Sequence, residues 1–411
     1  MEKKIAYWLY LEPYTFIFAG REQLVVYNSI NGQYLNVVDE TCKNLLAELQ
    51  VPENGYCIPV TEQQAKNKDI DPFIRTIKNS FSGDIIPFDP TKHSLNKKPF
   101  IVPPVLRLFN TVETIKAGGG LELGEVILRN LNEAVLFLPG HCDKKCAGCQ
   151  DYYKQFYHCS NFEEKNTLNY TEYQKLLDNL DACGVNKVNL IVNDFDDPVF
   201  LEIWKKRNSN TFKKKFVFNM RNLSKEVIKM FSDTDELCVY VNNSFSIDKL
   251  NEMKEVMHNL NVLWIHIIED EKNIEGIDLT GNISAVSFYN RQNLSFFEEN
   301  IYLTLEDLLE SPIDKQTIFR RQALNENFFG KLFILPSGEA YSNLNKEPLG
   351  NIKTDSLGQL VYNEFDNSKA WLLTRDSVSD NCSACQNRYL CPSISNYELV
   401  IGKNNLCHMQ T

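Results

Sequence analysis

Three closely spaced cysteines follow an apolar segment of the chain. Cys142, Cys146 and Cys149 form a C-x3-C-x2-C motif directly after residues 134–139, whose apolar run indicates a buried strand. Three thiolates can ligate three irons of a cubane and leave the fourth iron with an open coordination position. A zinc site and structural thiols are the alternative interpretations, but zinc ribbons normally combine two C-x2-C knuckles. The spacing therefore favours a 4Fe–4S cluster.

A further cysteine, Cys159, lies ten residues after this motif, behind a segment that contains Tyr152, Tyr153 and Tyr157. If Cys159 were a fourth ligand, the open iron position would be lost. The sequence leaves its role open.

A second cysteine group has the spacing C-x2-C-x5-C-x15-C and lies near the end of the sequence. Its members are Cys382, Cys385, Cys391 and Cys407. Four thiolates can close a tetrahedral zinc site or fully ligate an auxiliary cubane. The remaining cysteines are scattered singly and are interpreted as small buried hydrophobic residues: Cys42, Cys57, Cys183 and Cys238.

Composition narrows the class of protein. A chain of 411 residues is long enough for two or three domains, and its net charge of -11 argues against nucleic acid as a main partner. Glu12 and Pro13 interrupt the aromatic N-terminal run, and no later run is long enough to span a membrane. We therefore expect a cytoplasmic protein, in which the 12 cysteines are metal ligands or buried thiols rather than disulfides.

The N-terminal residues 1–90 predict a small module of strands followed by helices. Asn31-Gly32 is a strong hairpin signal, and Asp39 is placed to cap a helix. The expected strands are 7–18, 23–27, 33–38 and 56–60, and the expected helices are 40–50 and 72–81. Three strands followed by helices are typical of a winged-helix-like module. Residues 91–130, with Pro103-Pro104 and a run of three glycines, read as a linker.

The pattern then changes to alternating strands and helices over residues 131–300. The expected strands are 134–139, 187–192, 215–219, 236–242, 261–268 and 283–288, and the expected helices are 171–183, 197–207, 223–231 and 246–259. This alternation predicts an α/β fold with a parallel sheet, and we expect a partial (β/α) barrel. Functional residues in such folds lie at the C-terminal ends of the strands, which is where the cysteine motif falls.

These features resemble radical S-adenosylmethionine (SAM) enzymes with a C-terminal SPASM domain, which mature ribosomally made peptides. The resemblance rests on the C-x3-C-x2-C motif, the β/α alternation, the terminal cysteine group and the segments 332–339 and 349–352. It implies a PqqD-like precursor-recognition module at 1–90, a radical-SAM-like domain at 131–300 and a SPASM-like Cys-rich domain at 301–411.

The resemblance also implies cofactors and partners. Cys142, Cys146 and Cys149 would hold a 4Fe–4S cluster whose open iron binds SAM, and SAM cleavage would yield a 5′-deoxyadenosyl radical. The terminal group would hold a second, auxiliary cluster. The implied partners are a precursor peptide with a leader and an electron donor protein.

The sequence departs from that family at the SAM site. Gly148 replaces an aromatic residue before the third cysteine, and no Gly-Gly-Glu signature follows the second strand. The segment there contains Asp194, Asp196 and Asp197 instead, which are candidate SAM contacts or a solvated helix N-terminus. Such departures resemble the divergent pseudo-radical-SAM proteins of double-glycine-leader peptide systems in Bacteroidales.

Three functional hypotheses follow. The first is a radical-SAM-type peptide maturase, which the intact cysteine motif favours. The second is a catalytically silent protein that binds the precursor peptide, by strand addition for example, and presents it to another enzyme. The missing Gly-Gly-Glu favours the second. The third is a binding protein stapled by zinc.

Overall fold

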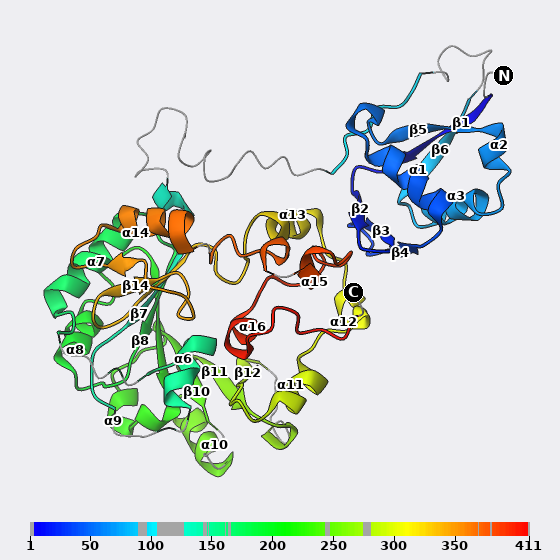
Figure 1. The fold of residues 1–411 in the computed structure, drawn as a ribbon. Coiled ribbons are helices and arrows are strands. Elements are labelled where there is room, and N and C mark those ends of the chain that lie inside the picture. Colours follow the sequence, from blue (N-terminus) through cyan, green and yellow to red (C-terminus); the bar gives the residue numbers. More distant parts are fainter. Residues whose placement is uncertain are drawn as a thin grey trace.

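A computed structural model describes residues 4–88, 97–104, 127–142, 146, 148–160, 162, 166–242, 247–273, 281–368, 370–378 and 380–409 (Figure 1). Most of the predicted linker, and the residues between the cysteines at 143–145 and 147, lie outside the described residues. No helix in the described part of the chain is long and apolar enough to cross a membrane.

The N-terminal part contains two small antiparallel sheets and two longer helices. Its elements are β1 (Ile5–Leu11), β2 (Thr15–Ala19), β3 (Leu24–Asn28), β4 (Tyr34–Val37), α1 (Glu40–Gln50), β5 (Cys57–Thr61), α2 (Glu62–Ala65), α3 (Ile70–Asn79) and β6 (Gly83–Pro87). In the described residues the sheets have the orders β5-β1-β6 and β2-β3-β4. The Asp39 side chain accepts a hydrogen bond from Cys42 N at 3.0 Å, so the predicted cap of α1 is confirmed. The predicted hairpin is also confirmed, because β3 pairs with β4 and Gly32 has a φ of 74°.

The single strand expected over residues 7–18 is wrong. The chain turns between β1 and β2, where Thr15 N donates to Glu12 O at 2.9 Å. β1 then pairs with β5 and β6, whereas β2 pairs with β3. The two halves of the aromatic run therefore belong to different sheets.

The central part is a large, mostly parallel sheet. Its parallel strands are β7 (Glu133–Phe137), β8 (Lys187–Ile191), β9 (Lys213–Asn219), β10 (Glu236–Val241), β11 (Asn261–Ile268) and β12 (Ile283–Ser287). The connecting helices are α6 (Cys149–Gln155), α7 (Tyr170–Ala182), α8 (Pro198–Lys205), α9 (Lys225–Ile228) and α10 (Ile247–Val256). Within the described residues the sheet has nine strands in the order β12-β11-β10-β9-β8-β7-β13-β14-β15. The predicted β/α alternation and parallel sheet are confirmed.

Alternate residues of each strand belong to two different hydrophobic cores. On β10, Leu237 and Val239 face the core that includes α7 and α8, whereas Cys238 and Tyr240 face the core that includes α6. Figure 1 shows α7 and α8 on one side of the sheet and α6 with α16 (Asn396–Ile401) on the other. Because both faces are covered, the strands are apolar almost throughout, as parallel strands usually are. The cysteine motif lies on the α6 side.

The C-terminal part extends this sheet and then becomes irregular. Its elements are α11 (Leu294–Asn300), α12 (Leu305–Leu309), α13 (Lys315–Ala323), β13 (Lys331–Ile334), β14 (Glu339–Tyr341), β15 (Gly350–Asn351), α14 (Leu357–Asn363), the short helices Glu364–Ser368 and Arg375–Ser377, α15 (Asp380–Ser383) and α16. β13 runs parallel to β7 and pairs with the edge of β7 opposite to β8. β14 and β15 then turn back antiparallel.

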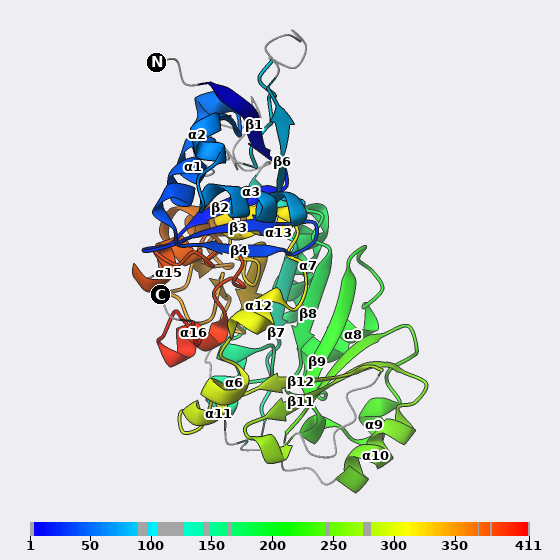
Figure 2. The ribbon, with the colours of Figure 1, turned by 90° about the vertical axis from the view of Figure 1, so that its right-hand side faces the viewer.

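The β2-β3-β4 sheet joins the N-terminal part to the C-terminal part. Phe16, Phe18 and Tyr27 on one face pack with Ile318 of α13 and with Leu390. The opposite face of the same sheet contributes to the N-terminal core. Both views place the sheet beside α13 and α15 (Figure 1, Figure 2). The sheet is therefore an apolar layer buried from both sides.

Candidate functional site

The cysteine motif lies where the sequence predicted it, beyond the C-terminal end of β7. Cys142 and Cys146 are in the loop, and Cys149 is the first residue of α6, where its N–H donates to Cys146 O at 3.2 Å. Gly140 brings this loop against the segment after β8. It has a φ of 130°, and a Cβ there would lie 2.5 Å from Cβ of Asp194.

The packing around position 148 also favours glycine. A Cβ at this position would lie 2.7 Å from the ring of Phe288, which follows β12, and 2.8 Å from the ring of Tyr152. These rings occupy the space that an aromatic side chain at position 148 would need. A side chain at position 148 would therefore displace these rings.

One cavity of about 180 Å³ connects the motif with the ends of β8 and β9. It is lined by Cys142, Cys146, Cys149, Gln150, Cys159, Ser160, Asn193, Asn219 and Asn222. Two polar atoms at this site, Asn193 Oδ1 and Ser160 Oγ, are buried and have no hydrogen-bond partner among the described residues. Buried polar atoms are normally paired, so this cavity has polar groups available for a bound molecule.

The residues after β9 bring contacts to two of the cysteines. Arg221 Nη1 donates to Cys146 Sγ at 3.5 Å, and Cys142 Sγ lies 3.9 Å from Asn222 Oδ1. Asn222 Nδ2 also donates to Asn193 O at 3.0 Å, which ties the end of β9 to the end of β8. A guanidinium beside a thiolate stabilises the charged form of the sulfur.

A buried polar network supports the floor of the cavity. His158 Nδ1 donates to the Cys159 carbonyl at 2.8 Å, and its Nε2 accepts from Asn219 Nδ2 at 2.9 Å. Burial lowers the pKa of His158 to about 4, so the ring is neutral, and its Nδ1 also lies 3.4 Å from Cys159 Sγ. Asn219 also donates to Asn242, whose Nδ2 donates to Tyr152 OH at 3.1 Å. The network joins β9, β10 and α6.

Cys159 lies in the wall of the same cavity as the three motif cysteines. Its side chain is 4% exposed. Burial raises the pKa of its thiol, and the neighbouring Cys149, Cys142 and Cys146 raise that pKa further. The structure thus brings together four thiols, one more than the motif provides.

The three candidate SAM contacts lie beside the cavity and are not among the residues that line it. Asp197 caps α8, because its Oδ1 accepts from Val199 N at 2.8 Å and from Phe200 N at 3.3 Å. Asp194 Oδ1 accepts from Asp196 N at 2.9 Å. From this segment Asn193 lines the cavity instead. A SAM contact at the three aspartates stays a prediction.

Several residues of this site were not predicted from the sequence: Ser160, Asn193, Asn219, Arg221 and Asn222. Most of them could have been predicted from their position directly after a predicted strand. Parallel strands end at one edge of the sheet, so polar residues after β8 and β9 lie close to the residues after β7.

The second cysteine group also converges. Cys382, Cys385, Cys391 and Cys407 line one cavity together with Arg375. Its volume of about 20 Å³ is just enough for one water molecule. No three His, Cys, Asp or Glu side chains in the described residues are close enough to hold a single ion. The four thiols would therefore have to move closer together to bind one zinc ion, or further apart to make room for a cubane.

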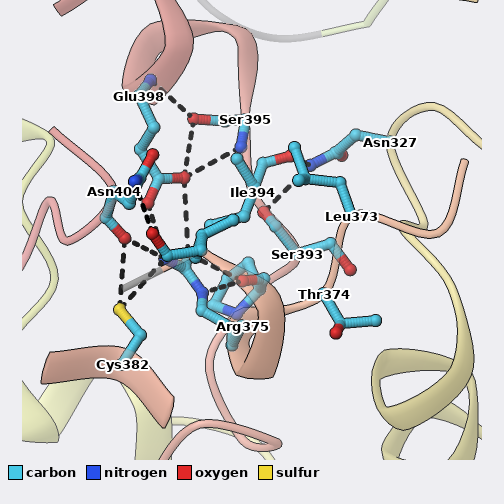
Figure 3. A network of polar contacts seen from close by, with 12 residues as sticks. Asn327, Leu373, Thr374, Arg375, Cys382, Ser393, Ile394, Ser395, Glu398 and Asn404 are labelled. Carbon is cyan, nitrogen blue, oxygen red and sulfur yellow. Dashed lines mark hydrogen bonds and ion pairs between the residues drawn. The ribbon is translucent and has the colours of Figure 1, made fainter. Parts of the chain in front are cut away.

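Arg375 organises the polar contacts beside this group (Figure 3). Its Nη1 lies 2.5 Å from Glu398 Oε1, donates to Asn404 O at 2.8 Å, and lies 3.9 Å from Cys382 Sγ. Its Nη2 donates to Pro392 O at 2.8 Å. Arg375 thus connects the segment before Cys382 with the segment between Cys391 and Cys407, and it places a positive charge beside Cys382.

The residues at the first site fit a 4Fe–4S cluster. Thiolates are the usual ligands of such clusters, and here the three thiols of one motif open into a shared cavity with an adjacent guanidinium. A cluster on these three cysteines would leave Asn193 Oδ1 and Ser160 Oγ available to form hydrogen bonds with a second bound molecule.

No protein-family model matches this chain, and no curated protein matches it significantly. Among solved structures it is similar to SuiB of Streptococcus suis, with 11% sequence identity, a TM-score of 0.43 and coverage of 97% of this chain and 100% of that chain. It is also similar to BtrN in complex with AdoMet and 2-DOIA, with 9% identity, a TM-score of 0.36 and coverage of 64% of this chain and 98% of that chain. At these identities and TM-scores, neither similarity establishes the function of this chain.

Proposed function

We propose that this chain is a radical-SAM-type protein that holds a 4Fe–4S cluster on Cys142, Cys146 and Cys149 and acts on a ribosomally made precursor peptide. One observation carries the proposal: the three cysteines of the motif line one cavity at the C-terminal edge of a mostly parallel sheet. That edge is where α/β folds of this kind place their functional residues.

The surrounding residues have definable roles toward the cluster. The Arg221 guanidinium offsets negative charge at Cys146. Asn193 Oδ1 is a hydrogen-bond acceptor, and Ser160 Oγ can donate or accept. A bound, reduced cluster would supply the electron that cleaves SAM, and a separate donor protein would reduce it. The C-terminal cysteines would hold an auxiliary cluster or zinc.

The N-terminal part supports the peptide side of the proposal. The sheet β5-β1-β6 has β5 and β6 at its edges in the described residues. An edge strand has unpaired backbone N–H and C=O groups, so it can accept an extended leader by strand addition. A precursor peptide in the cytoplasm is the partner we propose.

A second candidate function is a catalytically silent protein that binds and presents the peptide. The segment after β8 favours it, because Asp197 is used as the cap of α8 and no glycine pair is present between Asn193 and Asp197. The residues that would grip the amino group of SAM in an active family member are thus replaced.

Anaerobic reconstitution followed by an assay for 5′-deoxyadenosine separates the two candidates. The full-length protein is reduced chemically and incubated with SAM. Cluster binding with SAM cleavage supports the maturase, and cluster binding without cleavage supports the presenting protein. Failure to bind any cluster would contradict both.

A further inference from the structure

The position of Cys159 points to a function in the cluster site itself. We propose that Cys159 is a fourth thiolate ligand of the cluster on Cys142, Cys146 and Cys149, so that the resting cluster has no open iron. This inference rests on the proposed function, since it requires a cluster at the motif. It goes beyond that function by assigning the fourth coordination position to the chain itself.

Hydrogen bonds hold the chain at Cys159 beside the cavity that this residue lines. The carbonyl of Cys159 accepts the hydrogen bond from His158 Nδ1 at 2.8 Å, and the Cys159 Sγ lies 3.4 Å from the same nitrogen. His158 is fully buried and is held on its other side by Asn219 at the end of β9. The same strand end provides Arg221 and Asn222, which contact Cys146 and Cys142. The end of β9 therefore contacts Cys142, Cys146 and the segment that carries Cys159.

Burial alone does not explain this placement. Cys238 on β10 is also 4% exposed and belongs to the same hydrophobic core as Cys159. Cys238 is nevertheless not among the residues that line the cavity, whereas Cys159 is. The two cysteines are thus a matched pair: equally buried in one core, but only one of them faces the motif.

Four thiolates would occupy all four irons of a cubane. SAM would then have no iron to coordinate, which agrees with the loss of the glycine pair after β8. The Cys159 thiol releases its proton on ligation, and no electron transfer is needed. A stable cluster that does not respond to SAM is the expected property, and it favours the presenting function over the maturase.

The test compares full-length wild-type protein with the Cys159→Ala variant and the matched Cys238→Ala control, all reconstituted anaerobically. Each is oxidised with ferricyanide and examined by electron paramagnetic resonance (EPR) for a [3Fe–4S]⁺ signal. Each is also reduced, and its EPR spectrum is recorded with and without SAM. A Cys159→Ser variant, which keeps the shape of the side chain, is included in case the alanine variant is unstable.

We expect wild type and Cys238→Ala to retain about four irons at this site, because every iron is held by a thiolate. Cys159→Ala is expected to lose one iron on oxidation and to gain an EPR change on adding SAM. The inference is overturned if wild type already forms [3Fe–4S]⁺ and responds to SAM as Cys159→Ala does. Absence of a cluster from wild type would instead overturn the proposed function.

Discussion

The Tyr34 hydroxyl donates a hydrogen bond to Oδ1 of Asn387 at 2.9 Å, across the junction between the N-terminal part and the C-terminal cysteine group. The Asn387 N–H in turn lies 3.4 Å from Cys385 Sγ. Burial raises the pKa of Tyr34 to about 12, so the hydroxyl is a protonated donor at neutral pH. A side chain of the N-terminal module is thus connected to the candidate metal ligand Cys385 through a single residue, Asn387.

Replacing Tyr34 by Phe should loosen this junction. The change leaves Asn387 Oδ1 without its hydroxyl partner, a loss of about 1 kcal/mol for a typical hydrogen bond. Amide hydrogen exchange in β2–β4 should therefore become about fivefold faster if opening of the junction limits exchange. Tyr10→Phe, on β1 in the other N-terminal sheet, is the control. Equal exchange in both variants would show that the bond does not hold the junction.

Loss of the C-terminal metal site should release the N-terminal module. The segment between Cys385 and Cys391 supplies three of the docking contacts: Asn387 bonds Tyr34, Arg388 Nη1 donates to Ala19 O at 2.8 Å, and the Tyr389 and Phe18 rings pack edge-on at 5.6 Å. In a Cys385→Ser/Cys391→Ser variant, hydrogen exchange in β2–β4 should increase while that in β7–β10 stays unchanged. Cys183→Ser, at the end of α7, is the control. Protected β2–β4 amides in the double variant, with the metal gone, would contradict this coupling.

The Arg375–Glu398 pair should be necessary for the stability of the C-terminal part. The side chains are 9% and 3% exposed, so removing one partner leaves a buried charge without compensation. Arg375→Met should therefore cost about 3–5 kcal/mol in unfolding free energy. Arg320→Met breaks a more exposed pair with Glu326 and should cost less than about 1 kcal/mol. Thermal unfolding measures both. Arg375→Met/Glu398→Leu should recover part of the loss, and similar losses for the two single variants would refute the account.

Lys214 should make stability rise with pH in the alkaline range. Burial lowers the pKa of Lys214 to about 8, below its ordinary value of 10.5. Between these values the unfolded chain holds the proton and the native chain does not, so unfolding free energy increases with pH through that window. The gain is of the order of 2 kcal/mol, at about 1.4 kcal/mol per pKa unit. Between about pH 7 and about pH 10, the unfolding free energy of wild type should rise by this amount relative to that of Lys214→Met, because the other titratable groups are common to both proteins and cancel in the difference. Parallel profiles would exclude Lys214 as the cause.

Local patterns predicted the central fold, but not the sheet to which each N-terminal strand belongs. The strands of residues 131–300 were predictable because each is an apolar run followed by an amphipathic helix, and parallel strands follow from that order. The break between β1 and β2 was missed because aromatic and β-branched residues continue on both sides of Glu12 and Pro13. Their separation depends on β5 and β6, which lie far away in the sequence.

Only the part of the candidate site that lies within one short segment of the sequence was predictable. Spacing alone identified Cys142, Cys146 and Cys149. Arg221 and Asn222 were not predictable in this way, because they come near the cysteines only through the position of β9, two strands from β7 in the sheet. The role of Asp197 as a helix cap was already one of its two interpretations, and the geometry of α8 supports it.

The most direct test of the account is the iron and acid-labile sulfide content of the anaerobically reconstituted protein. Wild type is compared with a Cys142→Ala/Cys146→Ala/Cys149→Ala variant, with Cys238→Ala as the control for loss of a buried thiol. We predict that the triple variant loses about four irons and four sulfides per chain relative to wild type, as expected for one cubane. Cys238→Ala should match wild type. Iron and sulfide contents that are the same in all three proteins would contradict a cluster at Cys142, Cys146 and Cys149.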